Sequence, residues 1–384
     1  MYTIALKGGS YLSPLGGFIP GDVLLEGETI HTVGGSCTGK TELDCSGFMI
    51  LPGFIDIHTH GALGYDCMKA SPAQLLEWSA FLARHGITSF MPTTITAPVD
   101  EILQMIDRVK AAAALPGHGA QIVGVHIEGP YISPLHLGCH EASFVRKPSL
   151  DELSQFCERL GDGLKLRVTV APEMEGAMEF IRTVKKAGGY VSIGHTDATL
   201  DIVNEAVKNG ANSFTHLFNG MRGVHHREPG TAGAALVSDA YAEIIADGIH
   251  LRPDIIRLAV KAKNIDKMIT VTDAMQATGL SDGDYPFGGK TVYVRGGVAR
   301  IKEGNLAGST LTLDKAVRNL ADFAGIPLAE AVRAATVNPA RAIGLEGSTG
   351  TLEPGKQADI VIVNKQLEVL YTICKGEILY SRQS

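Results

Sequence analysis

The sequence predicts an α/β fold, a (β/α)8 barrel of the TIM type with a small β-sandwich domain built from both chain ends. Two observations favour this class. From residue 48 onward, short apolar runs typical of strands alternate with stretches of helical length. Several of these runs end in a histidine or an acidic residue, as expected where parallel strands bring their C-terminal ends to one pocket. The 384 residues suffice for one barrel and one accessory domain.

Strand and helix signals follow one another in order along the middle of the chain. Ser71-Pro72 is typical of an N-cap followed by proline at the first helical position, and it predicts a helix that stops at Gly86. Further helices are expected at 98–114, 200–209 and 253–262. The expected strands are 48–57, 87–91, 121–127, 166–171, 190–194, 212–215, 243–249 and 268–272. Such units in about 300 residues match the size of a (β/α)8 barrel with insertions.

The two ends of the chain have a different texture. Residues 1–50 contain short apolar runs separated by glycine-rich turns, and the tail predicts strands at 359–363, 369–373 and 378–380. Because neither end has enough apolar surface alone, we expect residues 1–50 and 346–384 to form one β-sandwich domain. Residues 51–345 would form the metal-dependent catalytic barrel. This barrel region ends with a predicted hairpin and two helices, at 290–294 with 298–301, 311–324 and 328–343.

Composition excludes several classes of partner. The chain is 45% hydrophobic and 20% charged, its net charge is -7, and no block is dense in lysine or arginine, so we expect no nucleic-acid partner. No apolar stretch reaches membrane-spanning length, and the N-terminus lacks the basic and apolar regions of a signal peptide. We therefore expect a cytoplasmic protein with no membrane partner. The 6 cysteines are scattered without a C-x-x-C pair and are expected to be free thiols.

A candidate metal site follows from residues at the ends of the expected strands. His58 and His60 are two positions apart on a strand, so both side chains face the same side and can chelate one ion. Glu128 follows an apolar run, and a carboxylate there is costly to bury without a cation or several donors. With His195 and His216 it forms a set of two histidines and one carboxylate that leaves a coordination position for water. Taken singly, each residue also fits a structural role.

Asp273 ends the last expected strand and could move a proton at such a site. A carboxylate beside a water on a metal can take its proton and return it to a leaving group, although a plain ligand or a helix cap remains the alternative. His126 is expected to face the same side as Glu128 and to support the site without ligating. Imidazole and carboxylate ligands suit several divalent metals. Among these metals we expect zinc, with iron as the alternative, in one or two ions per subunit.

A loop rich in positive charge, 221–227, could serve an anionic substrate. It carries Arg222, His225, His226 and Arg227, and an arginine fork suits a phosphate group. A solvated basic loop without a ligand is the alternative reading.

Longer motifs occur in order through nearly the whole chain. Residues 52–61 resemble the first-strand motif of the amidohydrolase superfamily. More specific motifs are His126-Ile127-Glu128-Gly129-Pro130-Tyr131, Gly194-His195-Thr196, Thr215-His216-Leu217-Phe218-Asn219, Arg227-Glu228-Pro229-Gly230, Asp247-Gly248-Ile249-His250, Thr272-Asp273-Ala274 and Leu306-Ala307-Gly308-Ser309. Together they resemble the family of N-acetylglucosamine-6-phosphate deacetylases.

The resemblance implies hydrolysis of the acetyl amide of N-acetylglucosamine 6-phosphate to glucosamine 6-phosphate and acetate, in amino-sugar catabolism or recycling. By position, it implies that Glu128, His195 and His216 hold the catalytic divalent ion. Asp273 would be general base and then general acid, and His140 would polarise the amide carbonyl. Some relatives lack the first-strand histidines and use one metal, whereas this chain has both.

The resemblance also implies the substrate contacts. Arg227 would bind the 6-phosphate, and together with His250 it would reach the neighbouring subunit's site, which implies a homodimer. The role of the Cys139 side chain stays open, because relatives often have another small residue there. The implied substrate-binding residues are Cys139, His140, Asn219, Gly220, Arg227, His250, Leu306, Ala307 and Gly308.

Three alternatives remain open from the sequence. A deacetylase for N-acetylgalactosamine 6-phosphate differs only at one sugar hydroxyl. A cyclic-amide hydrolase of the dihydroorotase kind typically bridges two metals with a modified lysine, whereas here Glu128 occupies the third-strand position. A non-catalytic scaffold on the same fold would be expected to lose ligands, and this chain has them all.

Overall fold

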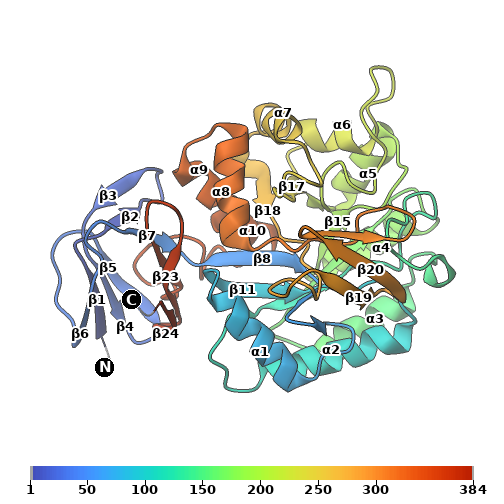
Figure 1. The fold of residues 1–384 in the computed structure, drawn as a ribbon. Helices are drawn as coiled ribbons and strands as arrows, with labels where there is room; N and C mark the ends of the chain where they lie inside the picture. Colours follow the sequence, from blue (N-terminus) through green and yellow to red (C-terminus); the bar gives the residue numbers. More distant parts are fainter. Residues whose placement is uncertain (1–2, 383–384) are drawn as a thin grey trace.

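The computed structural model describes residues 3–382, which form two regions side by side (Figure 1). The first strands of the chain, in blue, and the last strands, in red, lie together in a smaller region that is all β. The remaining chain forms the larger region, in which helices surround parallel strands. The predicted mixed α/β class is therefore confirmed.

The larger region is built on a curled set of parallel strands. One sheet has the order β12-β11-β8 and the next has the order β13-β14-β15-β16-β17-β18, all parallel. A parallel bridge between Thr93 and His126 joins the two sheets, and another between Thr59 and Ala274 joins the end of β8 to the segment that follows β18. The strands are β8 (Phe54–Thr59), β11 (Ile87–Pro92), β12 (Gln121–Ile122), β13 (Gly124–Ile127), β14 (Lys165–Val170), β15 (Tyr190–Ile193), β16 (Ser213–Phe214), β17 (Tyr241–Ile244) and β18 (Met268–Thr270).

Helices follow most of these strands. The predicted helix start at Ser71 is confirmed, because its side chain accepts from the backbone N–H of Gln74 while the Gln74 side chain accepts from the N–H of Ser71. The helices are α1 (Pro72–Ala83), α2 (Val99–Ala113), α3 (Leu150–Leu160), α4 (Ala177–Lys186), α5 (Leu200–Asn209), α6 (Gly230–Val237), α7 (Pro253–Lys263), α8 (Leu313–Ala324), α9 (Leu328–Arg333) and α10 (Val337–Ala342).

The single helix predicted at 328–343 is two helices, α9 and α10. The carbonyl of Ala334 accepts from the N–H of Thr270, and the carbonyl of Ala335 accepts from the N–H of Ile55. These hydrogen bonds connect the segment between α9 and α10 to β18 and β8. In a continuous helix, the carbonyl of Ala335 would need the N–H of Pro339, which proline does not have.

The strand predicted at 48–57 is also divided, at Gly53. Before this glycine, β7 (Met49–Pro52) pairs with β2 and β22 of the smaller region, whereas β8 pairs with β11 of the larger one. A Cβ atom on Gly53 would lie 2.2 Å from Oγ1 of Thr88, so a larger residue does not fit where the chain crosses between the regions.

The expected strand 243–249 ends early, at Ile244, so the prediction that His250 ends a strand is wrong. One carboxylate oxygen of Asp247 accepts from the N–H groups of Ile249 and His250, at 2.8 Å each, and turns the chain there. Asp273 likewise lies three residues beyond β18, which ends at Thr270.

The smaller region contains two sheets. Their strand orders are β5-β4-β1-β6 and β24-β23-β22-β7-β2-β3. One apolar cluster, separate from the main core, takes buried residues from both sheets, including Ile4 and Leu6 of β1 and Ile360 and Ile362 of β22. The strands are β1 (Thr3–Lys7), β2 (Ser10–Leu12), β3 (Phe18–Pro20), β4 (Val23–Glu26), β5 (Thr29–Val33), β6 (Thr41–Asp44), β22 (Ile360–Val363), β23 (Val369–Cys374) and β24 (Glu377–Ser381). The two ends of the chain therefore share one core.

An antiparallel sheet follows β18. The hairpin predicted in this segment is confirmed as β20 (Lys290–Arg295) and β21 (Val298–Ile301). A strand that was not predicted, β19 (Gly283–Phe287), pairs with β20 through a two-residue turn of Gly288 and Gly289, both with positive φ. A short hairpin of β9 (Gly61–Ala62) and β10 (Tyr65–Asp66) follows β8.

Two further expectations concern membranes and cysteines. Between residues 3 and 382, no helix has the length and apolar character needed to span a membrane. All 6 cysteines are free thiols, as predicted.

A charged pair in the smaller region predicts pH-dependent stability. The buried carboxylate of Asp22 accepts from Nζ of Lys7 at 2.6 Å and from the N–H groups of Gly8 and Cys37 at 2.9 and 3.0 Å. The Lys7 bond first, and then the two backbone bonds, lower the pKa of Asp22 to about 2 from 3.8. A lowered folded-state pKa stabilises the fold above pH 3.8, and this contribution is lost as the pH falls toward 2.

We therefore expect Asp22→Asn to lower the free energy of unfolding by about 1.5–3 kcal/mol at neutral pH, because a charged acceptor with three donors is lost. The deficit should shrink as the pH falls below 4. Thermal unfolding of both proteins between pH 7 and pH 3 measures this. A deficit that is the same at both ends of the range would contradict the assignment.

Candidate metal centre

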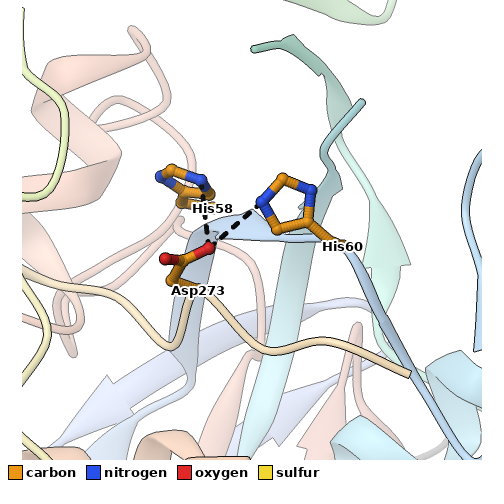
Figure 2. A group of neighbouring side chains, drawn as sticks. All are labelled: His58, His60 and Asp273. Atoms are coloured by element: carbon orange, nitrogen blue, oxygen red, sulfur yellow. Dashed lines mark ion pairs between the residues drawn. The ribbon is translucent and has the colours of Figure 1, made fainter. Parts of the chain in front are cut away.

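Two groups of buried side chains meet beyond the C-terminal ends of the parallel strands. In each group, the candidate ligand atoms lie within 4.8 Å of one another. Figure 2 shows the first group, in which the carboxylate of Asp273 faces both imidazole rings. The groups are His58, His60 and Asp273, and Glu128, His195 and His216. The structure thus brings together every residue that the sequence analysis proposed as a metal ligand.

Glu128 belongs to the second group and also contacts the first. Its Oε1 is 3.1 Å from Nε2 of His216 and 3.3 Å from Nε2 of His195. Its Oε2 is 3.2 Å from Nε2 of His60 and 3.4 Å from Nε2 of His58. Burial raises the pKa of this carboxyl, but the surrounding histidines bring it well below its usual range. One carboxylate oxygen therefore faces each group, which is a geometry that can bridge two cations.

The four histidines are oriented in the same way, with Nδ1 toward an oxygen acceptor and Nε2 toward the centre. A carbonyl oxygen can only accept, so the Nδ1 atoms that face carbonyls carry a proton, and a neutral ring in this orientation has its lone pair on Nε2. The Nδ1 contacts are His58 to Oε2 of Glu243 at 2.9 Å, His60 to the carbonyl of Thr93 at 3.1 Å, His195 to the carbonyl of His136 at 2.7 Å, and His216 to the carbonyl of Asn219 at 3.0 Å.

These orientations direct several lone pairs at one another. The Nε2 atoms of His195 and His216 are 3.0 Å apart. Nε2 of His58 is buried and has no hydrogen-bond partner among residues 3–382. Lone pairs held together in this way, beside two carboxylates, fit divalent cations, and oriented imidazoles are typical of metal ligands.

Backbone strain is concentrated at the same residues. His195, His216 and Asp273 follow three different strands, and all have positive φ, at 47°, 29° and 48°. Such conformations cost about 1–3 kcal/mol each for residues other than glycine, and in proteins they cluster at functional sites. The strain turns each side chain from the strand end into the centre.

His140 approaches the centre from the loop after β13. Its Nδ1 accepts from the backbone N–H of Thr96 at 3.2 Å, so the neutral ring carries its proton on Nε2. That Nε2 is 3.7 Å from Oε2 of Glu128. Burial lowers the pKa of His140 to about 4. A neutral ring can donate a hydrogen bond from Nε2 into the site.

Asp273 is held by its backbone as well as by its surroundings. Its N–H donates to the carbonyl of His58 at 2.9 Å, and its carbonyl accepts from the N–H of Ser309 at 2.7 Å. Its Oδ1 lies 3.1 Å from Nε2 of His60 and 3.5 Å from Nε2 of His58. Burial raises the pKa of Asp273, but His58 and His60 lower it to about 2. The side chain is therefore an ionised base at neutral pH.

A buried ion pair below the centre was not identified from the sequence. Oε1 of Glu243 lies 2.5 Å from Nη1 of Arg167, and both side chains are almost completely buried. Oε2 of Glu243 contacts Nδ1 of His58 and also accepts from the backbone N–H of His216 at 3.0 Å. Arg167 donates from Nη2 to Oγ of Ser192 at 2.8 Å. Glu243 thus contacts a ligand of each group, and Arg167 balances its charge.

The signal for this pair was a charged residue within an apolar strand. Arg167 is flanked by Leu166 and Val168, and Glu243 by Ala242 and Ile244. A charged side chain in a buried strand needs a partner of opposite charge. The presence of Arg167 in one such strand and Glu243 in another could therefore have predicted that the two form an ion pair. Asp56 in β8 gives the same signal. It is fully buried, burial raises its pKa to about 7, and it accepts from Oγ1 of Thr272 at 2.6 Å.

His126 faces the interior beside these groups but belongs to neither. Its Nε2 lies 2.7 Å from Oγ1 of Thr169, and its ring centroid is 4.7 Å from that of His58. The expectation that His126 would support the centre without ligating agrees with this position.

The centre opens into a cavity of about 560 Å³, which we call the catalytic cavity. Ala307 is fully buried and does not line the cavity, and its N–H donates to the carbonyl of Ala299. Arg227 is exposed on the 221–227 loop, bonded to Nε2 of His226 at 2.6 Å, and does not line this chain's own cavity. Of the residues expected to bind substrate, those that line it are Cys139, His140, Asn219, Gly220, His250, Leu306 and Gly308.

Comparison with known proteins agrees with this geometry. The amidohydrolase family matches residues 49–379. The chain belongs to the amidohydrolase family. Less similar solved structures show the fold alone, for example molinate hydrolase, with a TM-score of 0.64 at 16% identity over 98% of this chain and 94% of that one.

More similar relatives carry specific names. The chain is 40% identical over 336 residues to N-acetylglucosamine-6-phosphate deacetylase of Bacillus subtilis, covering 86% of this chain and 85% of that one. It is 39% identical over 339 residues to N-acetylgalactosamine-6-phosphate deacetylase of Escherichia coli O157:H7, covering 88% and 89%. The solved N-acetylglucosamine-6-phosphate deacetylase of Pasteurella multocida has a TM-score of 0.93 at 31% identity, covering 98% and 99%.

Proposed function

We propose that this amidohydrolase removes the acetyl group from N-acetylglucosamine 6-phosphate, releasing glucosamine 6-phosphate and acetate in amino-sugar catabolism or recycling. One observation carries the proposal. Glu128, His195, His216 and Asp273 converge in a single cavity, with His140 beside them. The names of the relatives support the choice of an acetylated amino-sugar phosphate as substrate.

We also propose the finer architecture. The parallel strands would form a complete (β/α)8 barrel over residues 51–345, supported by the Thr59–Ala274 bridge between the end of β8 and the segment that follows β18. Residues 1–50 and 346–384 would form a β-sandwich domain, supported by the apolar cluster that both of its sheets share.

The metal ligands fall into two sets in this proposal. Glu128, His195 and His216 would hold the catalytic ion, and His58 and His60 would hold a second ion that Glu128 shares. Zinc is the first expectation and iron the second, because imidazole and carboxylate suit both. A divalent ion bound there would supply a Lewis acid that acidifies water and polarises the amide carbonyl.

Two of the chain's own residues, Asp273 and His140, would also take part in the reaction. Asp273 would take a proton from the attacking water through its carboxylate and deliver it to the amine nitrogen as the C–N bond breaks. His140 would donate from Nε2 to the amide oxygen and stabilise the negative charge that develops there. The proton removed from water therefore leaves on glucosamine 6-phosphate, and the hydroxyl group leaves in acetate.

The sugar would lie against the loops after β16 and β17. Asn219 and Gly220 follow His216 directly, and His250 is fixed by its Nδ1 contact to Oδ2 of Asp247 at 2.6 Å. Leu306, Ala307 and Gly308 would close the other side of the sugar, with Ala307 acting through its backbone. Cys139 lines the cavity, and the role of its thiol stays open.

The position of Arg227 predicts a shared site. We propose a cytoplasmic homodimer in which Arg227 reaches the neighbouring subunit's cavity, because Arg227 is exposed and does not line its own. The expectation that His250 would also reach the neighbouring site disagrees with its position, because His250 lines the cavity of its own chain. Arg227→Ala and Asp273→Asn should each be nearly inactive alone. Mixed and reassembled in equal amounts, they should recover about one quarter of wild-type activity, since half of the dimers then hold one complete site.

Pull-down through an affinity tag carried by only one of the two variants would confirm the exchange of subunits between them. Recovery of no activity after confirmed exchange would contradict the placement of Arg227 in the neighbouring site. A matched mixture of Arg257→Ala with Asp273→Asn is the control, because Arg257 is exposed on α7 and does not line the cavity.

The central test pairs metal analysis with an assay. The purified protein should contain one or two divalent ions per chain and release acetate from N-acetylglucosamine 6-phosphate. Chelation should abolish the activity, and added zinc or iron should restore it. A metal-loaded protein that releases no acetate from this substrate would refute the proposed function, and a protein without metal would indicate a scaffold.

A second candidate is the epimeric substrate, N-acetylgalactosamine 6-phosphate. The Escherichia coli relative named for it is 39% identical, close to the 40% of the Bacillus subtilis relative. Parallel measurements of kcat/KM on the two epimers would decide between them. Deacetylation of either substrate keeps the same roles for Glu128 and Asp273.

A further inference from the structure

A second cavity lies directly beside the catalytic one. It has a volume of about 610 Å³. The two cavities share three lining residues, Ile95, Phe287 and Lys290. These side chains therefore form a partition, with the metal ligands on one side and the second cavity on the other.

The partition is built from the tip of a hairpin and a loop. Phe287 is the last residue of β19, and its ring meets that of His60 edge to face at a centroid distance of 5.3 Å. Ile95 lies in the loop after β11 and packs tightly on the hairpin turn, since a Cβ on Gly288 would be 2.5 Å from its Cδ1. Lys290 reaches the carbonyl of His140 at 3.5 Å. The partition thus contacts the centre directly through His60.

The order of the strands determines which part of a substrate faces the partition. β11 and β16 lie on opposite sides of the ring of parallel strands, with three strands between them in each direction. The order around this ring is β8-β11-β13-β14-β15-β16-β17-β18, and the Thr59–Ala274 bridge closes it onto β8. The sugar is assigned to Asn219 and Gly220 after β16. With the amide at the centre, its acyl group would point away from the sugar, toward Ile95, which follows β11, and Phe287, the last residue of β19.

The second cavity can hold more than a methyl group. Its wall is mixed, with apolar Met68, Ala97 and Phe144 beside polar groups. Gln276 lines it, is 4% exposed, and donates to the carbonyl of Pro286. Its Oε1 has no hydrogen-bond partner in the described chain. Because Oε1 is itself buried, an acyl chain in this cavity would contact the apolar part of the wall rather than this atom.

We propose that Ile95 and Phe287 set the length of the acyl group that this enzyme hydrolyses, and that the second cavity is the space a longer acyl chain occupies. The inference rests on the proposed function, because it uses the assigned position of the amide. Acetyl fits in front of the partition. A four-carbon acyl group meets Phe287 and passes into the second cavity only when that ring, or the side chain of Ile95, is removed.

The test compares kcat/KM for N-butanoylglucosamine 6-phosphate with that for the N-acetyl compound. The wild type should strongly favour acetyl, because an excess methylene in a closed pocket costs about 10–200-fold. Phe287→Ala and Ile95→Ala should each raise the butanoyl-to-acetyl ratio by at least about tenfold.

Phe144→Ala is the matched control. Phe144 lines the second cavity without belonging to the partition, so its removal enlarges the cavity and leaves the acyl ratio unchanged. Ratios unchanged in both partition variants, or raised equally by Phe144→Ala, would overturn the proposal. Wild-type protein that releases no acetate would instead refute the proposed function, so the two failures are distinguishable. Two independent partition variants guard against misfolding of one.

Discussion

Replacing Asp273 with asparagine is expected to lower turnover of N-acetylglucosamine 6-phosphate by about 10³-fold, the middle of the range for loss of a positioned acid–base group. Asparagine keeps the shape of the side chain but cannot take a proton. The carboxylate is ionised at neutral pH and lies 3.1 Å from Nε2 of His60. The ion at Glu128, His195 and His216 should be retained, because Asp273 does not belong to that group.

Steady-state kinetics and metal analysis of the same preparation check this expectation. Asp254→Asn is the matched control, since Asp254 is exposed on α7 and remote from the cavity, and its kinetics should be those of the wild type. Turnover within tenfold of the wild type would remove Asp273 from the reaction. Loss of all metal from Asp273→Asn would show that its main role is ligation.

The candidate centre could be predicted from the sequence because its ligands follow strand ends. In a curled parallel sheet, every strand delivers its next residues to one rim, so the positions of His58, Glu128 and His195 in the sequence imply convergence. Fold class followed from the same alternation. The prediction needed no knowledge of side-chain orientation, since the positive φ of His195 and His216 supplies the final turn.

The features that the sequence did not predict depend mainly on contacts between segments that are distant in the sequence. The helix predicted at 328–343 is broken because β8 and β18 take the carbonyls of Ala334 and Ala335. β19 was missed because its alternation is weak, although it carries Phe287. The partners of Glu243 come from β8, β14 and the turn after β16, so no local pattern could identify them.

The largest effect on stability is expected from Arg167→Met. The variant leaves the Glu243 carboxylate as a buried charge with no cationic side chain to balance it, and breaking a buried pair in this way costs about 3–5 kcal/mol. Glu243 also contacts Nδ1 of His58 at 2.9 Å. Loss of its partner should therefore disturb the His58 ring and reduce metal occupancy at His58 and His60.

A double-mutant cycle distinguishes this charge balance from simple loss of packing. Glu243→Gln removes the buried charge, so Arg167→Met combined with Glu243→Gln should be more stable than Arg167→Met alone, although one more wild-type residue has been lost. Thermal unfolding and metal titration of the four proteins measure both effects, with Arg257→Met on the exposed face of α7 as the control. Additive losses would show that Arg167 acts by filling space. Recovery of stability without recovery of metal would show that Glu243 must carry its charge to orient His58, because glutamine can fill the same volume but accepts the Nδ1 proton less strongly.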